Sequence, residues 1–126
     1  MKFIVTPIFL MALQVGFSQM TEKNWEKATF ETTRDGKEIY QTIIEFKDVP
    51  LTKVQEVKLR EAFGSKEEFI DLSVDVKTLT IYHYSSLDDS GVKAFVIPVA
   101  NNFDLIKSNP ITLAEMREIY SKTNSH

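Results

Sequence analysis

Two neighbouring segments of the chain alternate between apolar and polar residues. In residues 69–76 and 79–84 the apolar side chains largely recur at every second position, which is the period of a half-buried strand. Only Lys77-Thr78 lies between the segments, so we predict a tight antiparallel hairpin. The side chains expected to face the core of this hairpin are Leu72, Val74, Val76, Leu79, Ile81 and His83.

A second hairpin is predicted upstream of the first. Residues 25–33 are rich in threonine and aromatic side chains, a composition that favours strands, and residues 38–46 supply the return strand. The intervening Asp35-Gly36 pair tolerates the positive φ angles of a type I′ turn. We therefore expect an extra strand in front of the strand at 38–46.

Capping signals predict two helices. Thr52 with Gln55, and Thr112 with Glu115, have the spacing of a capping box, in which the two side chains satisfy backbone N–H groups at a helix start. We expect the first helix to reach about residue 63, with Gly64 as a left-handed C-terminal cap. The second should run to about residue 121.

The segment between the second hairpin and the last helix is ambiguous. Apolar residues at helical spacing favour a short helix at 89–97, although residues 94–97 also fit a strand. A last short strand is expected at 103–107. Ser108-Asn109-Pro110 should then stop it, because proline has no N–H to donate to a sheet.

The N-terminus has the pattern of a secretory signal peptide. Lys2 precedes an apolar run that ends near Leu13, and the small residues Gly16 and Ser18 follow, so we predict cleavage after Ser18. An uncleaved membrane anchor and a buried N-terminal strand are the alternatives. No second apolar run approaches 18 residues, so the processed chain is expected to be soluble and located in the periplasm or outside the cell.

Composition narrows the classes of function. The chain has 126 residues, with 15 Lys and Arg against 18 Asp and Glu; loss of Lys2 with the signal leaves 14 basic residues and a net charge of −4. This mild acidity does not match a nucleic-acid surface. The absence of Cys excludes disulfides, thiolate metal sites and thiol nucleophiles. Residues 19–126 are enough for a single domain.

The order of predicted elements over residues 38–107 is strand, helix, strand, strand, helix, strand. This is the ferredoxin-like split βαβ order. We therefore predict an α+β fold with an antiparallel sheet, an extra N-terminal strand and an extra C-terminal helix. The stretch from Phe69 to Tyr82, which follows a helix ending in glycine and has an acidic turn before Lys77-Thr78, resembles the central hairpin of heavy-metal-associated domains.

The resemblance implies a fold and argues against the activity of that family. Its members bind a soft metal ion through a Cys-x-x-Cys motif in the loop that enters the first helix. The corresponding loop here, Lys47 to Thr52, has no Cys, and Glu61 stands where an apolar helix residue is expected. No metal-binding residue is carried over and no cofactor is expected. A degenerate copper- or zinc-handling module is the alternative function.

The sequence contains few candidates for catalytic or metal chemistry. His83 lies on a predicted strand, and we interpret it as a core histidine, because a single His without clustered ligands makes no transition-metal site. Asp88-Asp89-Ser90-Gly91 lacks the ligand spacing of a calcium loop and is read as a turn or helix cap. No Gly-flanked nucleophile is present. We predict that the protein is not an enzyme; a pocket joining His83 to several acids would favour a small enzyme as a third interpretation.

The outward face of the central hairpin is the predicted interaction surface. Tyrosines on an open sheet give rigid contact area for a partner. The six residues of this face are Asp71, Ser73, Asp75, Thr80, Tyr82 and Tyr84. The alternative is that Trp25, Phe30 or the C-terminal helix covers it.

These observations lead to one functional expectation. The chain should be an exported, non-catalytic binding or interaction domain, with an unknown protein or small molecule as its partner. Nucleic acid is not expected as a partner, nor is a membrane after the signal is removed.

Overall fold

The computed structural model describes residues 20–47 and 50–124. The predicted signal peptide at 1–18 and two residues of the loop before the first capping box lie outside the described residues. The described elements, in chain order, are α2 (Glu22–Thr33), β1 (Ile39–Phe46), α3 (Lys53–Gly64), β2 (Phe69–Val74), β3 (Thr78–Tyr84), α4 (Asp89–Val96), β4 (Phe103–Ile111) and α5 (Leu113–Asn124).

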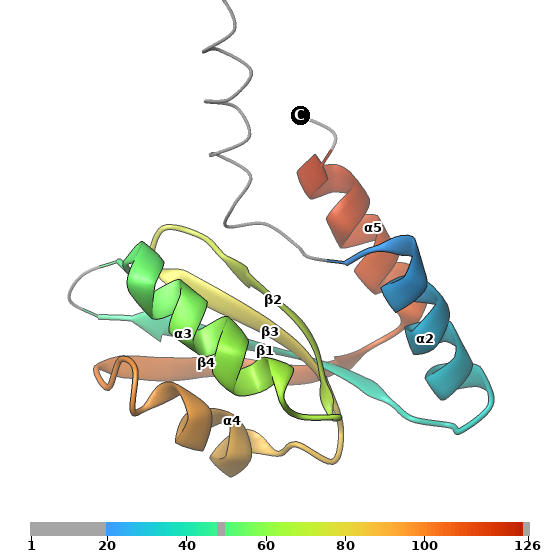
Figure 1. Ribbon diagram of the computed structural model, residues 1–126, viewed down its shortest axis with the longest axis horizontal. Helices are drawn as coiled ribbons and strands as arrows, with labels where there is room; N and C mark the ends of the chain where they lie inside the picture. The colour runs from blue at the N-terminus through green and yellow to red at the C-terminus, as the bar shows by residue number, and fades with distance from the viewer. Residues whose placement is uncertain (1–19, 48–49, 125–126) are drawn as a thin grey trace, which may run out of the picture.

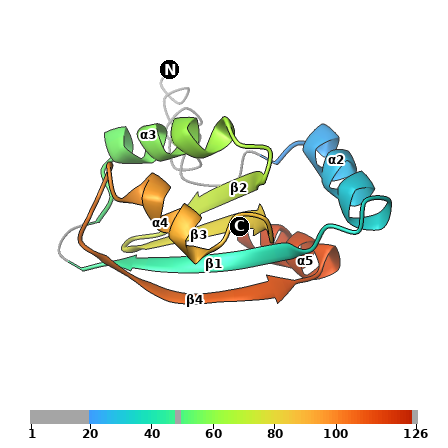
Figure 2. The ribbon, with the colours of Figure 1, turned by 90° about the horizontal axis from the view of Figure 1, so that it is seen from below.

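The four strands form one antiparallel sheet in the order β2-β3-β1-β4. Helix α3 connects β1 to β2, and α4 connects β3 to β4, which is the ferredoxin-like split βαβ topology predicted from the sequence. Figures 1 and 2 show α3 and α4 lying along one face of this sheet. Helices α2 and α5 gather at the end of the sheet where β1 begins and β4 finishes.

The helix starts follow the local capping signals. Thr52 and Gln55 form the full capping box at the start of α3, and the predicted pair Thr112 and Glu115 does the same before α5. The ambiguous segment is the helix α4, as favoured. Gly64, however, is the last residue of α3 rather than a left-handed cap, and Ser65 after it has a φ of −83°.

The predicted extra N-terminal strand is wrong, because residues 22–33 form the helix α2. The side chain of Thr21 caps this helix by accepting a hydrogen bond from the backbone N–H of Asn24. Trp25 and Ala28 lie three residues apart on the buried side of α2, a helical spacing that the strand interpretation did not use. Gly36 does have the positive φ expected of a turn, 69°, but the turn joins a helix to β1.

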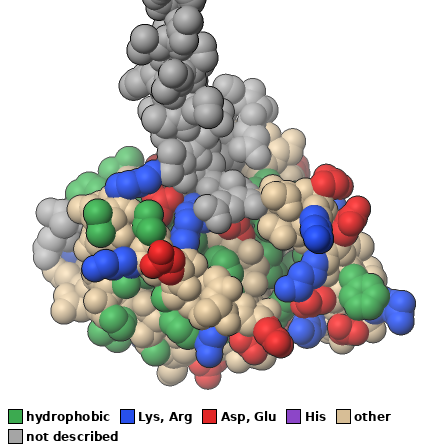
Figure 3. Space-filling view, viewed as in Figure 1, with side chains coloured by type: hydrophobic (Ala, Val, Ile, Leu, Met, Phe, Trp, Pro, Cys, Tyr) green, Lys and Arg blue, Asp and Glu red, His purple; other side chains and the backbone are tan. Residues whose placement is uncertain are grey.

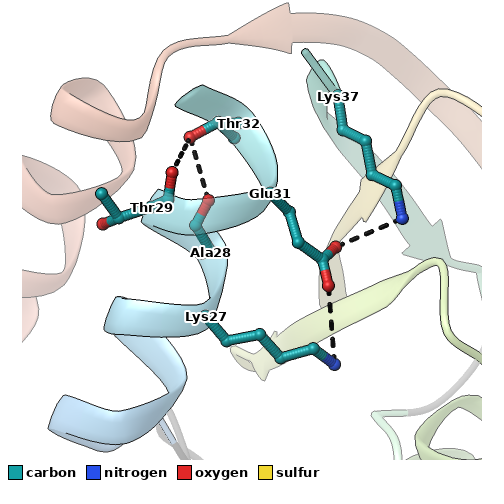
Figure 4. A network of polar contacts seen from close by, with 6 residues as sticks. All are labelled: Lys27, Ala28, Thr29, Glu31, Thr32 and Lys37. Atoms are coloured by element: carbon teal, nitrogen blue, oxygen red, sulfur yellow. Dashed lines mark hydrogen bonds and ion pairs between the residues drawn. The ribbon is translucent and has the colours of Figure 1, made fainter. Parts of the chain in front are cut away.

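Threonines inside α2 are accommodated by hydrogen bonds to the preceding turn. The hydroxyl groups of Thr29, Thr32 and Thr33 donate to backbone carbonyl oxygens four residues earlier, at 2.7–2.9 Å; the bond of Thr32 to the carbonyl of Ala28 is drawn in Figure 4. This back-bonding satisfies side chains that otherwise favour strands. The strand-like composition of the segment is therefore compatible with a helix, and this helix buries Trp25 and Ala28.

The last strand is longer than predicted. β4 continues through Ser108, Asn109 and Pro110, which were expected to stop it. Proline is tolerated there because β4 is an edge strand of the sheet, where a missing N–H can face away from the ladder. The extension places Ser108 opposite Thr42 of β1.

Two apolar clusters lie on opposite faces of the sheet. The first joins the sheet to α3 and α4; its buried members are Ile44, Phe46, Leu59, Phe63, Leu72, Leu79, Ile81, Leu87, Val92 and Val96. The second joins the sheet to α2 and α5; its buried members are Trp25, Ile39, Tyr82, Tyr84, Met116 and Tyr120. The predicted inward face of the hairpin is correct for Leu72, Leu79 and Ile81, whereas Val76 is 71% exposed.

Candidate functional site

The predicted open face of the central hairpin is largely covered. Tyr82 and Tyr84 are 2% and 3% exposed, so the interpretation of them as an open contact surface is wrong. The alternative holds in part: Trp25 and the C-terminal helix cover this face, whereas Phe30 is half exposed. The cover is aromatic. The ring centroid of Tyr120 lies 5.4 Å from that of Trp25 and 5.5 Å from that of Tyr82.

Glu31 of α2 fixes this cover to the sheet. Figure 4 shows its carboxylate between Lys27 and Lys37, and the nearest nitrogen–oxygen distances are 3.9 and 3.3 Å. The hydroxyl group of Tyr84 also hydrogen-bonds Glu31, and the pKa of this tyrosine is raised, first by burial and then by the charge of Glu31. The Tyr84 hydroxyl is thus a structural donor.

The polar residues of the predicted face have separate environments. Asp71 is buried, and its carboxylate accepts a 2.7 Å hydrogen bond from Tyr120 and pairs with Arg60 at 3.5 Å. Arg60 also pairs with Glu56, at 3.2 Å. Of the other predicted residues, Ser73 and Thr80 are half-buried and Asp75 is exposed near the hairpin turn. The structure therefore does not bring the six residues together as one accessible site.

The face of the molecule seen in Figure 3 carries acidic and basic side chains in close alternation, with apolar side chains scattered among them. It presents no broad area of a single charge. A binding site is better sought in a concave feature of the molecule, where several side chains converge on one ligand.

A hollow of about 430 Å³ lies where the end of β3 meets the start of α4. Strands β1, β3 and β4 supply one part of its wall, and the loop before α4 with the first turn of that helix supplies the other. Its lining residues are Tyr40, His83, Ser85, Leu87, Asp88, Asp89, Ser90 and Ser108. The hollow joins His83 to two acids, Asp88 and Asp89. A pocket of this kind was the feature expected to favour a small enzyme.

His83 is a buried and fully bonded histidine, as predicted for a core position. Its Nδ1 lies 3.0 Å from the backbone carbonyl oxygen of Tyr84, and its Nε2 lies 2.6 Å from Oγ1 of Thr42. A carbonyl oxygen only accepts, so Nδ1 carries a proton. The imidazole also stacks on the ring of Tyr40, with centroids 6.1 Å apart.

Burial keeps the imidazole of His83 neutral. Desolvation lowers its pKa from the ordinary value of 6.5, and the hydrogen bond to the Tyr84 carbonyl and the charge of Asp89 oppose this only in part. In the neutral ring, a protonated Nδ1 leaves Nε2 as an acceptor. Thr42 therefore donates its hydroxyl proton to Nε2.

A chain of hydroxyl groups extends from His83 across three strands. Oγ of Ser108 on β4 lies 2.8 Å from Oγ1 of Thr42 on β1. Because the Thr42 proton points to His83, Ser108 is the donor in this pair. The hydrogen bonds thus run in one direction, from Ser108 through Thr42 and His83 to the carbonyl of Tyr84.

The acidic side of the hollow is a helix start, as the sequence indicated. Asp88 is the N-cap of α4 and accepts a 2.9 Å hydrogen bond from the backbone N–H of Gly91. A Cβ at Gly91 would lie 2.8 Å from Cδ1 of Leu87, so a side chain there would require the Leu87 side chain to shift. Glycine at this position therefore allows the loop to pack tightly beneath the first turn of α4.

Two other kinds of site are absent from residues 20–47 and 50–124. No group of three or more His, Cys, Asp or Glu side chains in these ranges is placed to hold a metal ion. Within the same ranges, no helix combines the length and apolarity needed to span a bilayer.

Sequence reasoning did not find Tyr40, Thr42 and Ser108 as site residues. Tyr40 and Thr42 are ordinary residues of a predicted strand, and Ser108 belongs to the segment that was expected to stop the last strand. Only the register of β1 against β3 and β4 brings them to His83. The acids of the loop before α4 were noted, but only as a turn or cap. Comparison with protein-family models, with curated proteins and with solved structures gives no significant match to this chain.

Proposed function

We propose that the chain is an exported, non-catalytic binding domain whose ligand is a small polar molecule or a single side chain of a partner. The observation that carries this proposal is the hollow beside His83, whose volume suits a small ligand. Export is supported by the signal-like N-terminal sequence. The face predicted from Tyr82 and Tyr84 is not part of this proposal, because both side chains are buried.

The chemistry of the hollow favours binding over catalysis. A proton leaving Ser108 would have to pass through Thr42 to reach His83, and a histidine with a lowered pKa is a weak base. Acyl transfer also needs donors around a developing oxyanion, whereas Asp88 and Asp89 line this wall. The metal-handling alternative has little support from His83, because both ring nitrogens are already engaged.

Nuclear magnetic resonance with a library of small polar fragments would test the proposal on the processed chain. Binding fragments should shift the amide signals of the residues that line the hollow, and each fragment should be recovered chemically unchanged. Ser90→Tyr places a bulky ring in the hollow and should abolish these shifts. Ser86→Tyr is the matched control, because Ser86 is exposed in the adjoining loop before α4 and is not among the residues lining the hollow.

Two results would count against this function. Fragment shifts confined to other surfaces, or equal binding by the Ser90→Tyr variant, would mean that the hollow is not the site. Chemical conversion of a bound fragment by the parent protein, lost in Ser108→Ala, would favour the enzyme interpretation instead.

A further inference from the structure

The direction of the hydroxyl chain determines what Ser108 presents to the hollow. Its single proton is donated to Thr42, 2.8 Å away, because Thr42 donates in turn to His83. The Ser108 oxygen therefore offers only lone pairs to a ligand. A serine hydroxyl is ordinarily both donor and acceptor, so the buried histidine gives this group a fixed polarity.

The charged side chains that line the hollow likewise accept hydrogen bonds from a ligand. Asp88 and Asp89 carry the formal charges, and no Lys or Arg is among its lining residues. A carboxylate accepts hydrogen bonds and does not donate them when ionised. The strand wall and the helix wall are therefore both rich in acceptors.

An aromatic ring completes the wall. Tyr40 is half-buried and stacks on His83, so its ring is held in place beside the hollow. Ring faces attract cations through the aromatic quadrupole. This attraction adds to that of the carboxylates and is absent for an anionic ligand.

The start of α4, in contrast, would attract an anion. A helix N-terminus has the equivalent of roughly half a positive charge and attracts anions. Here Asp88 already bonds the N–H of Gly91, and with Asp89 it places two formal negative charges at the same end. The carboxylates therefore outweigh the helix dipole, and an anion is disfavoured.

We infer that the ligand is a small organic cation with N–H donors, such as a primary ammonium or guanidinium group, bound between Asp89, Ser108 and the ring of Tyr40. This inference rests on the proposed binding function and names its ligand class. The N–H groups donate to the Ser108 oxygen and to the carboxylates, while the cationic group lies against the ring of Tyr40.

Four matched probes test the charge and the donors separately. The processed chain is titrated with n-butylammonium, tetramethylammonium, n-butanol and butyrate, with amide shifts at the hollow as the readout. We expect n-butylammonium to bind most tightly and butyrate least. Equal binding of n-butanol or butyrate would overturn the cationic class, and equal binding of tetramethylammonium would overturn the role of the donors. Inorganic phosphate is added as a fifth probe, and its preferential binding at α4 would also refute the inference.

Substitutions at Asp89 and Ser108 test where the cation binds. Asp89→Asn should weaken n-butylammonium binding about three- to fivefold, the effect of one exposed charge pair, and Ser108→Ala should weaken it about threefold or more. Asp35→Asn removes an exposed carboxylate from the turn before β1 and should leave affinity unchanged. Unchanged affinity in Asp89→Asn, with a native circular dichroism spectrum, would reject the assignment. If neither these probes nor the fragment library shift the hollow, the proposed binding function itself fails.

Discussion

Replacing Thr42 by Val tests the hydrogen-bond chain directly. Thr42 is fully buried and lies between Ser108 and His83, 2.8 and 2.6 Å from their side-chain atoms. Valine has nearly the same shape but cannot donate a hydrogen bond. Ser108 is half-buried and can turn towards water, whereas Nε2 of His83 is left as a buried acceptor without its donor.

The size of the effect follows from two opposing terms. A buried polar group that loses its partner costs about 1–3 kcal/mol, and the methyl group that replaces the hydroxyl recovers less than about 1 kcal/mol by its burial. We therefore expect the free energy of unfolding to fall by about 1–2 kcal/mol. At a denaturant dependence of about 1.5 kcal/mol per molar urea, the unfolding midpoint moves down by about 1 M.

Urea unfolding at pH 7.5, followed by the fluorescence of Trp25, measures this loss. Thr80→Val is the control, because Thr80 is half-buried on the other face of β3; it should change stability by less than about 0.5 kcal/mol. His83→Phe should destabilise the Thr42→Val protein less than it destabilises the parent, because it removes the acceptor that has lost its donor. A loss below about 0.5 kcal/mol in Thr42→Val, or strict additivity of the two substitutions, would refute the assigned hydrogen-bond chain.

Three further outcomes are expected. Because burial lowers the pKa of His83, the unfolded chain takes up the proton first, so stability should fall as pH drops from about 6.5 towards the lower folded pKa; this part of the pH profile should vanish in His83→Phe. Tyr82→Ala should lower the free energy of unfolding by about 3–5 kcal/mol, whereas Phe30→Ala, at a half-exposed ring, should cost much less, and equal losses in denaturant titrations would contradict the described cover. Intact-mass measurement of protein recovered outside the cytoplasm should give a chain that begins at Gln19, and retention of residues 1–18 would disprove the predicted cleavage.

The features predicted correctly from the sequence depend on nearby residues. The Thr52 and Thr112 boxes need only a partner three residues away, and the alternation that buries Leu79 and Ile81 is visible within one strand. Chain order alone then gave the split βαβ topology, since short connections leave few arrangements of such elements.

The incorrect predictions concern features set by distant residues. Helix α2 has the composition of a strand, and its Trp25 docks against Tyr120, far along the chain. The apolar cluster that contains this contact also buries Tyr82 and Tyr84, the tyrosines predicted to be open. Ser108 could not be recognised as a site residue, because its partner Thr42 is 66 positions away and the pairing depends on the register of β4.

The bonds of Asp71 affect how the molecule unfolds. Arg60 of α3 and Tyr120 of α5 both contact this buried carboxylate, although their helices pack against different faces of the sheet. A terminal helix held by apolar contacts alone can open as a separate low-energy unit, with fast amide hydrogen exchange. Detachment of α5 would here remove a hydrogen bond from a buried charge that Arg60 continues to hold. The amides of α5 should therefore exchange more slowly than apolar packing of a terminal helix alone would give, and Tyr120→Phe should speed their exchange by the loss of this one bond.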